Sequence, residues 1–319
     1  VSAETLPLSP EGTIQLAEHA PELMRRHEWD CLVYLSDLPR YVDDHPMIGE
    51  VSPDTHAALV AVPVLGAFRV GDRAQDLVLD LIRVMQRSES QDEEAIASVL
   101  GRSDVSAHLV SEPTDMVRLV LTGRRRRPQV LAGMVRSNRP GRLLSALTGC
   151  MAAAVAAGAF GIFYGSLAPV AEAQAPWRLA LIRLLVVGVL TTWLIIRNGL
   201  WNVERGSDMI WQRGLDNAST VITVGLSVLM LYVGLVAAMI VLAFVVLAPS
   251  YLRGELLHAV GAPEYLKLAL LSAAMGIMAG ALGANFDQED SVREATFSRR
   301  YNERRKLFDA QQRRESEQE

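Results

Sequence analysis

The hydrophobic positions of the chain follow two patterns that change near residue 140. Before that point apolar runs are short and separated by turn residues, whereas after it four long apolar runs follow one another. A helix needs about 20 apolar residues to cross a hydrocarbon core of ~30 Å. The second pattern therefore predicts an α-helical integral membrane protein with a bundle of four transmembrane helices, at residues 143–167, 179–196, 220–246 and 268–286.

The first 123 residues have the periodicities of a small α/β domain. Short apolar runs bounded by turn residues predict three strands, at residues 30–35, 47–51 and 57–62. Apolar residues at helical spacing predict three helices, at residues 11–26, 74–86 and 92–100. Pro21 predicts a kink or break in the first of these helices, because proline removes a backbone hydrogen-bond donor.

A basic segment, residues 124–142, joins the two patterns. It opens with four consecutive arginines, Arg124–Arg127, and continues as a short amphipathic stretch at 128–138 that suits a helix lying along the inner membrane surface. Nucleic-acid binding is a poor explanation of the arginine run, because no aromatic residues interleave with it and the preceding domain is acidic. We interpret the run as a topology signal and expect no nucleic-acid partner.

The positions of arginine and lysine predict the orientation of the four helices. Loops on the cytoplasmic side of a membrane carry an excess of these residues. Within residues 124–319, eighteen of them lie in the basic segment before the first predicted helix, between the second and third, or after the fourth, whereas only Arg178, Arg253 and Lys267 lie near the opposite loops. We therefore expect a protein of the cell membrane whose two termini are cytoplasmic and whose first partner is the lipid bilayer.

Composition and charge agree with this division. The 319 residues are 50% hydrophobic and 21% charged, with a mean hydropathy of +0.20, which excludes a disordered chain and a single soluble globule. Residues 1–123 hold 21 acidic and 9 basic residues, a net charge of −12, while residues 124–319 hold 15 and 22, a net charge of +7. A helix predicted at 291–314 is basic, so we expect it to contact either anionic lipid or the acidic domain.

Polar residues after the strand predicted at 30–35 form the best candidate ligand site of the α/β domain. Asp37 stands at the end of that strand, where α/β domains commonly place ligand-binding carboxylates, and His45 and His56 follow in the next loops. The alternative is turn chemistry, since Asp37 precedes a Leu-Pro pair and aspartate side chains stabilise such turns.

The sequence holds no motif for a metal or a cofactor. The helix predicted at 74–86 contains no histidine, so the HExxH zinc motif is absent, and so are the phosphate-binding and dinucleotide-binding glycine loops. Asp43, Asp44 and His45 have the chemistry of metal ligands, but a solvated turn is the better interpretation. We predict no metal site, no cofactor and no catalytic residue.

Arg183 is the only charged residue inside a predicted transmembrane helix. Such a charge marks a candidate functional site by default, and its expected partners are Glu172, Glu255 and Glu264. The alternative is that its long side chain reaches the outer membrane surface, which is about one helical turn away.

Small residues recur at helix-packing spacing on the first and fourth predicted transmembrane helices. The two stripes are Ala157, Gly161 and Gly165, and Gly276, Gly280 and Ala284. Such stripes let helix backbones approach closely, either within the bundle or between two copies of the chain. They therefore predict close helix packing, and association of two copies of the chain is one form that this packing can take.

Five segments distributed over the chain are distinctive in combination: WDCLVYLSDLP (Trp29–Pro39), ALVAVPVLGA (Ala58–Ala67), GMVRSNRP (Gly133–Pro140), NASTVITV (Asn217–Val224) and GALGANFDQEDSVREATFSRR (Gly280–Arg300). With these segments the chain resembles a family of uncharacterised multipass membrane proteins from actinobacteria. The resemblance implies a cytoplasmic α/β domain joined to four transmembrane helices, with extra sequence before the first helix. It implies no activity and no catalytic residue.

Three functional hypotheses follow from these patterns. The lack of a catalytic motif and of a conduction signature favours a non-enzymatic scaffold or sensor whose α/β domain binds a protein partner or a small ligand. The alternative is a transporter or channel component that uses Arg183 and the glycine-lined helix faces. An enzyme based on Asp37, His45 and His56 is the third hypothesis.

Overall fold

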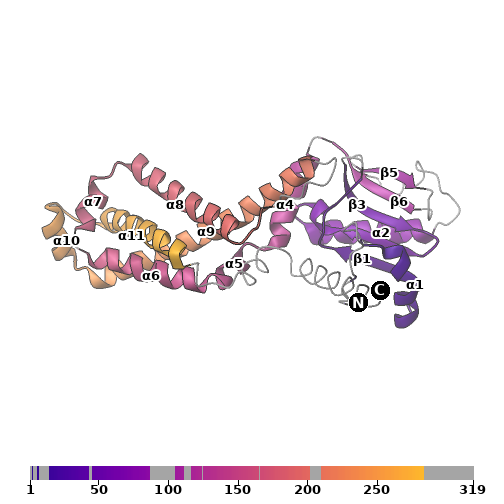
Figure 1. The fold of residues 1–319 in the computed structure, drawn as a ribbon, viewed down its shortest axis with the longest axis horizontal. Helices are drawn as coiled ribbons and strands as arrows, with labels where there is room; N and C mark the ends of the chain where they lie inside the picture. The colour runs from indigo at the N-terminus through magenta and orange to yellow at the C-terminus, as the bar shows by residue number, and fades with distance from the viewer. Residues whose placement is uncertain are drawn as a thin grey trace, which may run out of the picture. The chain divides into compact units, whose positions relative to one another are not determined.

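The structure is a computed structural model, and it describes residues 14–42, 45–86, 105–110, 116–123, 125–164, 166–201 and 210–283, together with Ser2 and Leu6. The chain divides into two compact units (Figure 1). Among the described residues, the α/β unit holds the chain up to Asn138 and residues 210–219. The helical unit holds residues 139–201 and 220–283.

A mixed sheet forms the centre of the α/β unit. Its strands pair in the order β1-β4-β3-β6-β5, and β2 pairs with the beginning of β3. β1 and β4 are parallel, whereas the other neighbours are antiparallel. The bounds are β1 Leu32–Ser36, β2 Arg40–Val42, β3 His45–Ser52, β4 Ala57–Ala61, β5 Val105–Val110 and β6 Met116–Leu121.

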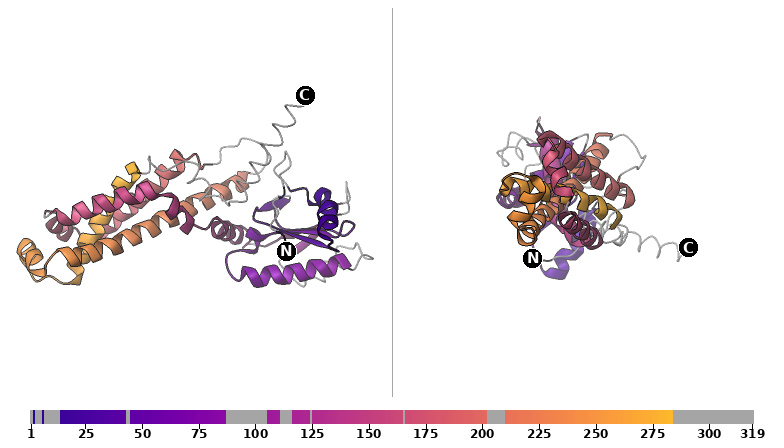
Figure 2. Two further views of the ribbon diagram at one scale, coloured as in Figure 1. Left: turned by 90° about the horizontal axis from the view of Figure 1, so that it is seen from below. Right: turned by 90° about the vertical axis from the view of Figure 1, so that its left-hand side faces the viewer.

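Helices cover the two faces of this sheet. The helix α2 (Val70–Gln86) packs its buried leucines on one face together with the 3-10 helix η1 (Val62–Leu65), and α1 (Leu16–His27) packs on the other (Figure 2). The α2 face carries Val51, Val60 and Leu119, while the α1 face carries Leu32 and Leu59, because successive strand residues point to opposite faces.

The strands predicted at 30–35, 47–51 and 57–62 correspond to β1, β3 and β4, and the helix predicted at 74–86 is the main part of α2. The expected break at Pro21 was wrong, since α1 continues through it. β2, β5 and β6 were not predicted. Asp43, Asp44, the helix at 92–100 and the basic helix at 291–314 lie outside the described residues.

The expectation that residues 128–138 lie along the membrane surface is corrected by the structure. They belong to α4 (Arg126–Asn138), whose Val130 and Met134 are buried in the same core as α2. Gly133 lies so close to the Pro63 carbonyl oxygen that no side chain fits between them, and the Gln129 side-chain amide donates a 3.0 Å hydrogen bond to the Val64 carbonyl. The amphipathic face of this helix therefore completes a protein core.

The helical unit is built from four long helices and short connecting ones (Figure 1). Two of the connecting helices, α7 and α10, contact each other where the long helices turn back. The bounds are α5 Gly141–Ala146, α6 Thr148–Phe163, α7 Leu167–Ala173, α8 Pro176–Arg197, α9 Ile210–Val246, α10 Pro249–Leu256 and α11 Ala262–Gly283.

Three of the described helices, α8, α9 and α11, are long and apolar enough to cross a membrane. The first predicted span is not one straight helix: α4 and α5 together make an angle of 60° with α6, and a fourth span exists only if this bent pair counts as one. The spans predicted at 179–196, 220–246 and 268–286 fall within or largely overlap α8, α9 and α11. The prediction of four spans stays a prediction.

The helices α6 and α11 pack through small residues. A Cβ atom added to Gly276 would collide with the Ala154 carbonyl oxygen, and one added to Gly280 would lie 3.0 Å from the Cys150 carbonyl oxygen. Gly158 and Gly161 of α6 similarly approach α11 at Ser272. Gly276 and Gly280 of the stripe predicted on α11 make this contact, and so does Gly161 of the stripe predicted on α6. The contact on α6 also includes Cys150, Ala154 and Gly158, while Ala157 is only half-buried, and Gly165 and Ala284 lie outside the described residues. Both stripes pack within the chain.

Candidate functional site

The predicted ligand residues of the α/β unit do not form one group. Asp37 follows Ser36 at the end of β1, and His56 precedes Ala57 at the start of β4. The parallel register pairs Leu32 with Ala57 and Ser36 with Ala61, so Asp37 and His56 lie beyond opposite ends of these strands, about 20 Å apart along the strand direction. His45 begins β3 and lies toward the end of the sheet that carries Asp37.

The turn after β1 is stabilised by Ser36. Its buried hydroxyl accepts a 3.2 Å hydrogen bond from the Leu38 backbone N–H. The sequence prediction gave this role to the Asp37 side chain, and for Asp37 it stays a prediction. His56 is exposed in the turn before β4 and adopts a left-handed φ of 47°.

Sequence reasoning missed a group of charged side chains on the sheet, which we call the charge cluster: Arg40 of β2, Glu50 of β3 and Arg118 of β6. The register places Glu50 directly opposite Arg118, so both side chains leave the same face. Residues three apart in a regular strand point to opposite faces, but the register of β3 shifts between Met47 and Gly49, so Met47 and Glu50 point to the same face. Arg40 of β2 pairs with Met47. This bulge therefore gathers the cluster on the α1 face.

Both guanidinium groups of the charge cluster converge on one oxygen of Glu50. Arg40 Nη1 lies 3.4 Å and Arg118 Nε lies 3.5 Å from Glu50 Oε2. The side chains of Arg40, Glu50 and Arg118 are 17%, 11% and 29% exposed. All three named atoms are buried, and none has a hydrogen-bond partner in the part of the chain that the structure describes. The contacts are thus ion pairs at the long end of the range, without the geometry of hydrogen bonds.

Burial has an electrostatic effect on this cluster. Loss of solvation lowers the pKa of Arg40, an effect that the Glu50 carboxylate opposes and that the Arg118 charge increases. Two positive groups and one negative group leave a net charge of +1 in a partly water-excluded place. Within the described residues no three metal-ligating side chains come together. Guanidinium groups have the fork geometry that matches the oxygens of carboxylate and phosphate.

The signal for the charge cluster was present in the sequence. Glu50 interrupts the apolar run of β3, and Arg118 interrupts the apolar run of β6. A charged residue at an inward position of a strand is uncommon unless it has a partner. The partnership was not visible, because β2 and β6 were not predicted and the two residues are 68 positions apart.

A second polar contact of the α/β unit involves the beginning of α9. The ring of Trp211 meets the ring of Tyr41 edge to face at a centroid distance of 4.9 Å, and the Arg127 guanidinium lies 5.2 Å from the Trp211 ring centre. Burial, with a smaller contribution from the Asp216 carboxylate, raises the pKa of Tyr41 well above its ordinary value. This junction of Tyr41, Arg127 and Trp211 holds the first turn of α9 on the sheet and on α4.

In the helical unit, Arg183 does not form the predicted ion pair. Its Nε donates a 3.0 Å hydrogen bond to the Leu179 carbonyl one turn earlier in α8. No carboxylate among the described residues, Glu172, Glu255 and Glu264 included, lies within ion-pair distance of it. Glu172 instead pairs with Lys267 at 2.9 Å.

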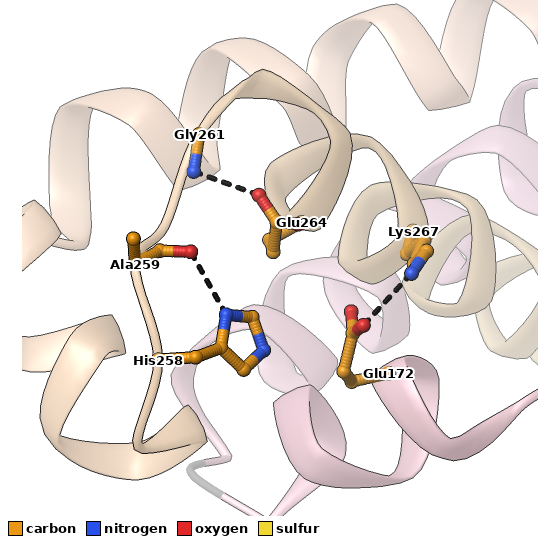
Figure 3. A network of polar contacts seen from close by, with 6 residues as sticks. All are labelled: Glu172, His258, Ala259, Gly261, Glu264 and Lys267. Carbon is orange, nitrogen blue, oxygen red and sulfur yellow. Dashed lines mark hydrogen bonds and ion pairs between the residues drawn. The ribbon is translucent and has the colours of Figure 1, made fainter.

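The Glu172–Lys267 pair belongs to a small polar network at the turn between α10 and α11 (Figure 3). The Gly261 backbone N–H, just before α11, donates a 2.7 Å hydrogen bond to Glu264 Oε2, which is one half of a capping box. His258 Nδ1 lies 2.8 Å from the Ala259 carbonyl oxygen. The contacts cap α11 and tie it to α7, which is a structural role.

Comparison with protein-family models, with curated proteins and with solved structures finds no match to this chain.

Proposed function

We propose that this chain is a multipass protein of the cell membrane that acts, without catalysis, as a sensor or scaffold whose α/β unit lies on the cytoplasmic side. The Arg and Lys distribution, eighteen against three, supports this orientation. The surface supports the membrane location: among the described residues, every exposed large apolar side chain except Leu35, Phe68 and Leu79 lies in the helical unit.

The observation that carries the proposal is the course of α9. This helix is 37 residues long, and its first ten residues belong to the α/β unit while the others belong to the helical unit. Trp211 holds the beginning of the helix through Tyr41 and Arg127, and the continuation is apolar. A helix is stiff over this length, so a change at Tyr41 reaches the apolar part without passing through a loop. We infer that α9 couples ligand or partner binding to the helical unit.

Hydrogen exchange of the full chain in lipid nanodiscs tests the coupling. Trp211→Ala removes the contacts with Tyr41 and Arg127, and we expect faster exchange both in residues 210–219 and in the adjoining turns of α9 up to Ser227. Trp177→Ala is the matched control, because this tryptophan is 65% exposed and belongs to α8. If the effect of Trp211→Ala stops at Ser219, the coupling proposal is wrong.

Reporter fusions test the orientation separately. A reporter that is active only outside the cytoplasm is expected to be silent after Glu319 and active when placed within residues 168–175. The reverse result would contradict the orientation and leave the coupling test unaffected.

The transporter alternative has a direct test of its own. It rests on Arg183 and the glycine faces, but the arginine bonds to its own helix and the glycines of α6 and α11 are in contact with each other. We therefore expect proteoliposomes to show no solute flux that depends on Arg183. A flux that Arg183→Ala abolishes would favour transport over the sensor proposal.

A further inference from the structure

We propose that the charge cluster of Arg40, Glu50 and Arg118 binds a small oxyanion, the phosphate or carboxylate group of a soluble ligand. The inference rests on the proposed function and deepens it, because it names the class of ligand that the α/β unit senses.

The first argument is the charge balance. Removing an ionised group from water costs several kcal/mol unless it is paired and hydrogen-bonded. In this cluster one carboxylate oxygen faces two guanidinium groups, so one positive charge has no counterpart within it. An oxyanion supplies that missing charge.

The second argument is the geometry of the pairs. A charge-assisted hydrogen bond between guanidinium and carboxylate has a length of about 2.7–2.9 Å. The distances of 3.4 and 3.5 Å are longer, and Arg40 Nη1 and Arg118 Nε have no hydrogen-bond partner among the described residues. The two donors come from β2 and β6, which both pair with β3, and each keeps hydrogen-bonding capacity that a bound anion can use.

A buried hydroxyl without a described partner lies on the same face of the sheet, two residues further along β3 than Glu50. Ser52 lies two residues after Glu50 on β3, so its side chain leaves the same face of the sheet, and it is only 3% exposed. Its Oγ has no hydrogen-bond partner in the described part of the chain. Serine hydroxyls and guanidinium groups both donate hydrogen bonds of the kind that phosphate and carboxylate oxygens accept. Glu50 then competes with the bound anion for the two arginines.

Anion titration of the full chain in a neutral detergent without phosphate tests the proposal. Inorganic phosphate and citrate are added at constant ionic strength, and calorimetry gives the Kd for each. We expect the wild-type chain to bind at least one of them, with a rise of the melting temperature. Arg118→Gln is expected to weaken binding about tenfold or more, because it removes a charge-assisted contact. The phosphate and citrate results show which oxyanion is preferred.

Two further variants keep the test sharp. Arg83→Gln makes the same chemical change at an exposed arginine of α2 that pairs with Asp80, and binding is expected to stay within about twofold of wild type. Glu50→Gln removes the internal competitor and is expected to tighten binding, an effect that a purely structural ion-pair cluster does not produce. Absence of binding to both anions, or equal binding by Arg118→Gln and wild type, would overturn the proposal. Neither result bears on the coupling through α9.

Discussion

The α/β unit and the helical unit bury their side chains in opposite ways. In the α/β unit the large apolar residues point inward, and the most deeply buried ones include Leu77, Leu81 and Leu119. In the helical unit the close contact between α6 and α11 is made by glycine, alanine, cysteine and serine, while residues such as Leu184 and Val245 point outward.

The difference is the one expected if the α/β unit lies in water and the helical unit in lipid, as we propose. In water a core forms because apolar area is removed from the solvent, which favours large side chains inside. In lipid this driving force is missing between helices, and close approach of backbones replaces it, which favours small residues inside. The stabilisation of about 25 cal/mol per Å² of buried apolar area therefore applies to the core of a unit in water, and it does not apply to contacts between helices in lipid. Substitutions in the two units are expected to differ accordingly.

The largest effect is expected from Leu81→Ala. Leu81 is fully buried between α2 and the sheet, and truncation of such a residue leaves a cavity that costs about 2–5 kcal/mol of unfolding free energy. Native-state hydrogen exchange of the sheet amides in the full chain measures this loss. A change below about 1 kcal/mol would mean that the α/β core does not rest on apolar burial.

Gly276→Leu is the corresponding substitution in the helical unit. The added side chain would meet Ala154 and Leu235, so α6 and α11 must separate, at a cost of about 1–3 kcal/mol. Thermal unfolding in detergent measures the effect. Gly234→Leu on α9 is the matched control, since a Cβ atom there meets nothing within 4 Å, and it is expected to leave the melting temperature unchanged or slightly raised.

Tyr41→Phe is expected to have a smaller effect, of the opposite sign. The buried Tyr41 hydroxyl has no hydrogen-bond partner among the described residues, so its removal is expected to stabilise the α/β unit by about 1 kcal/mol near neutral pH. Hydrogen exchange again measures the change. A loss of more than about 1 kcal/mol would show that the hydroxyl makes a stabilising contact.

The pH dependence of the same variant provides a separate measurement. The raised pKa of Tyr41 means that the folded chain keeps the phenol protonated, so this group does not affect stability below about pH 10, the ordinary tyrosine value. As the pH rises further the unfolded chain ionises first, and the folded state loses stability. Unfolding between pH 9 and 11 is expected to be less steeply pH-dependent in Tyr41→Phe than in wild type. Equal slopes would contradict the buried position of the ring.

The smallest effect is expected from Leu184→Ala. This leucine is 71% exposed on α8, and if lipid surrounds it, its removal neither opens a cavity nor changes contact with water. The melting temperature in nanodiscs is expected to change by less than the equivalent of about 0.5 kcal/mol. A large loss of stability would mean that this face of α8 packs against protein, as in a dimer.

The parts of the fold that sequence could predict are those with a local signal. β1, β3 and β4 were visible because a turn bounds each apolar run, and α8 and α9 because they are apolar over many residues. β2 is three residues long, and β6 contains Arg118 in the middle of its apolar run, so neither has the expected pattern. The segment that forms α4 was predicted to lie on the membrane surface, because an amphipathic pattern shows that one side of a helix is buried but does not show what covers it. The close contact between Gly133 and Pro63 shows that the helix packs on η1 of the α/β unit.

The candidate site was less predictable than the fold. Asp37 and His56 are near each other in sequence, but the parallel pairing of β1 and β4 puts them at opposite strand ends. Arg40, Glu50 and Arg118 are distant in sequence, and only pairing of three strands, with a bulge after Met47, brings them to one face. Non-local pairing of this kind leaves no periodic pattern in the sequence.

The resemblance to a family of multipass membrane proteins stays a prediction.

The division of the α/β unit between two separate stretches of chain has a consequence for its biosynthesis. Residues up to Asn138 leave the ribosome first, but Trp211 follows only after roughly 70 further residues that contain α6 and α8. At usual translation rates that interval lasts on the order of 4–14 s. During this time the contacts of Tyr41 and Arg127 with the Trp211 ring cannot form. The α/β unit therefore receives Trp211 only after the two apolar helices α6 and α8 have been synthesised, so this packing step is a late event in the folding of the chain.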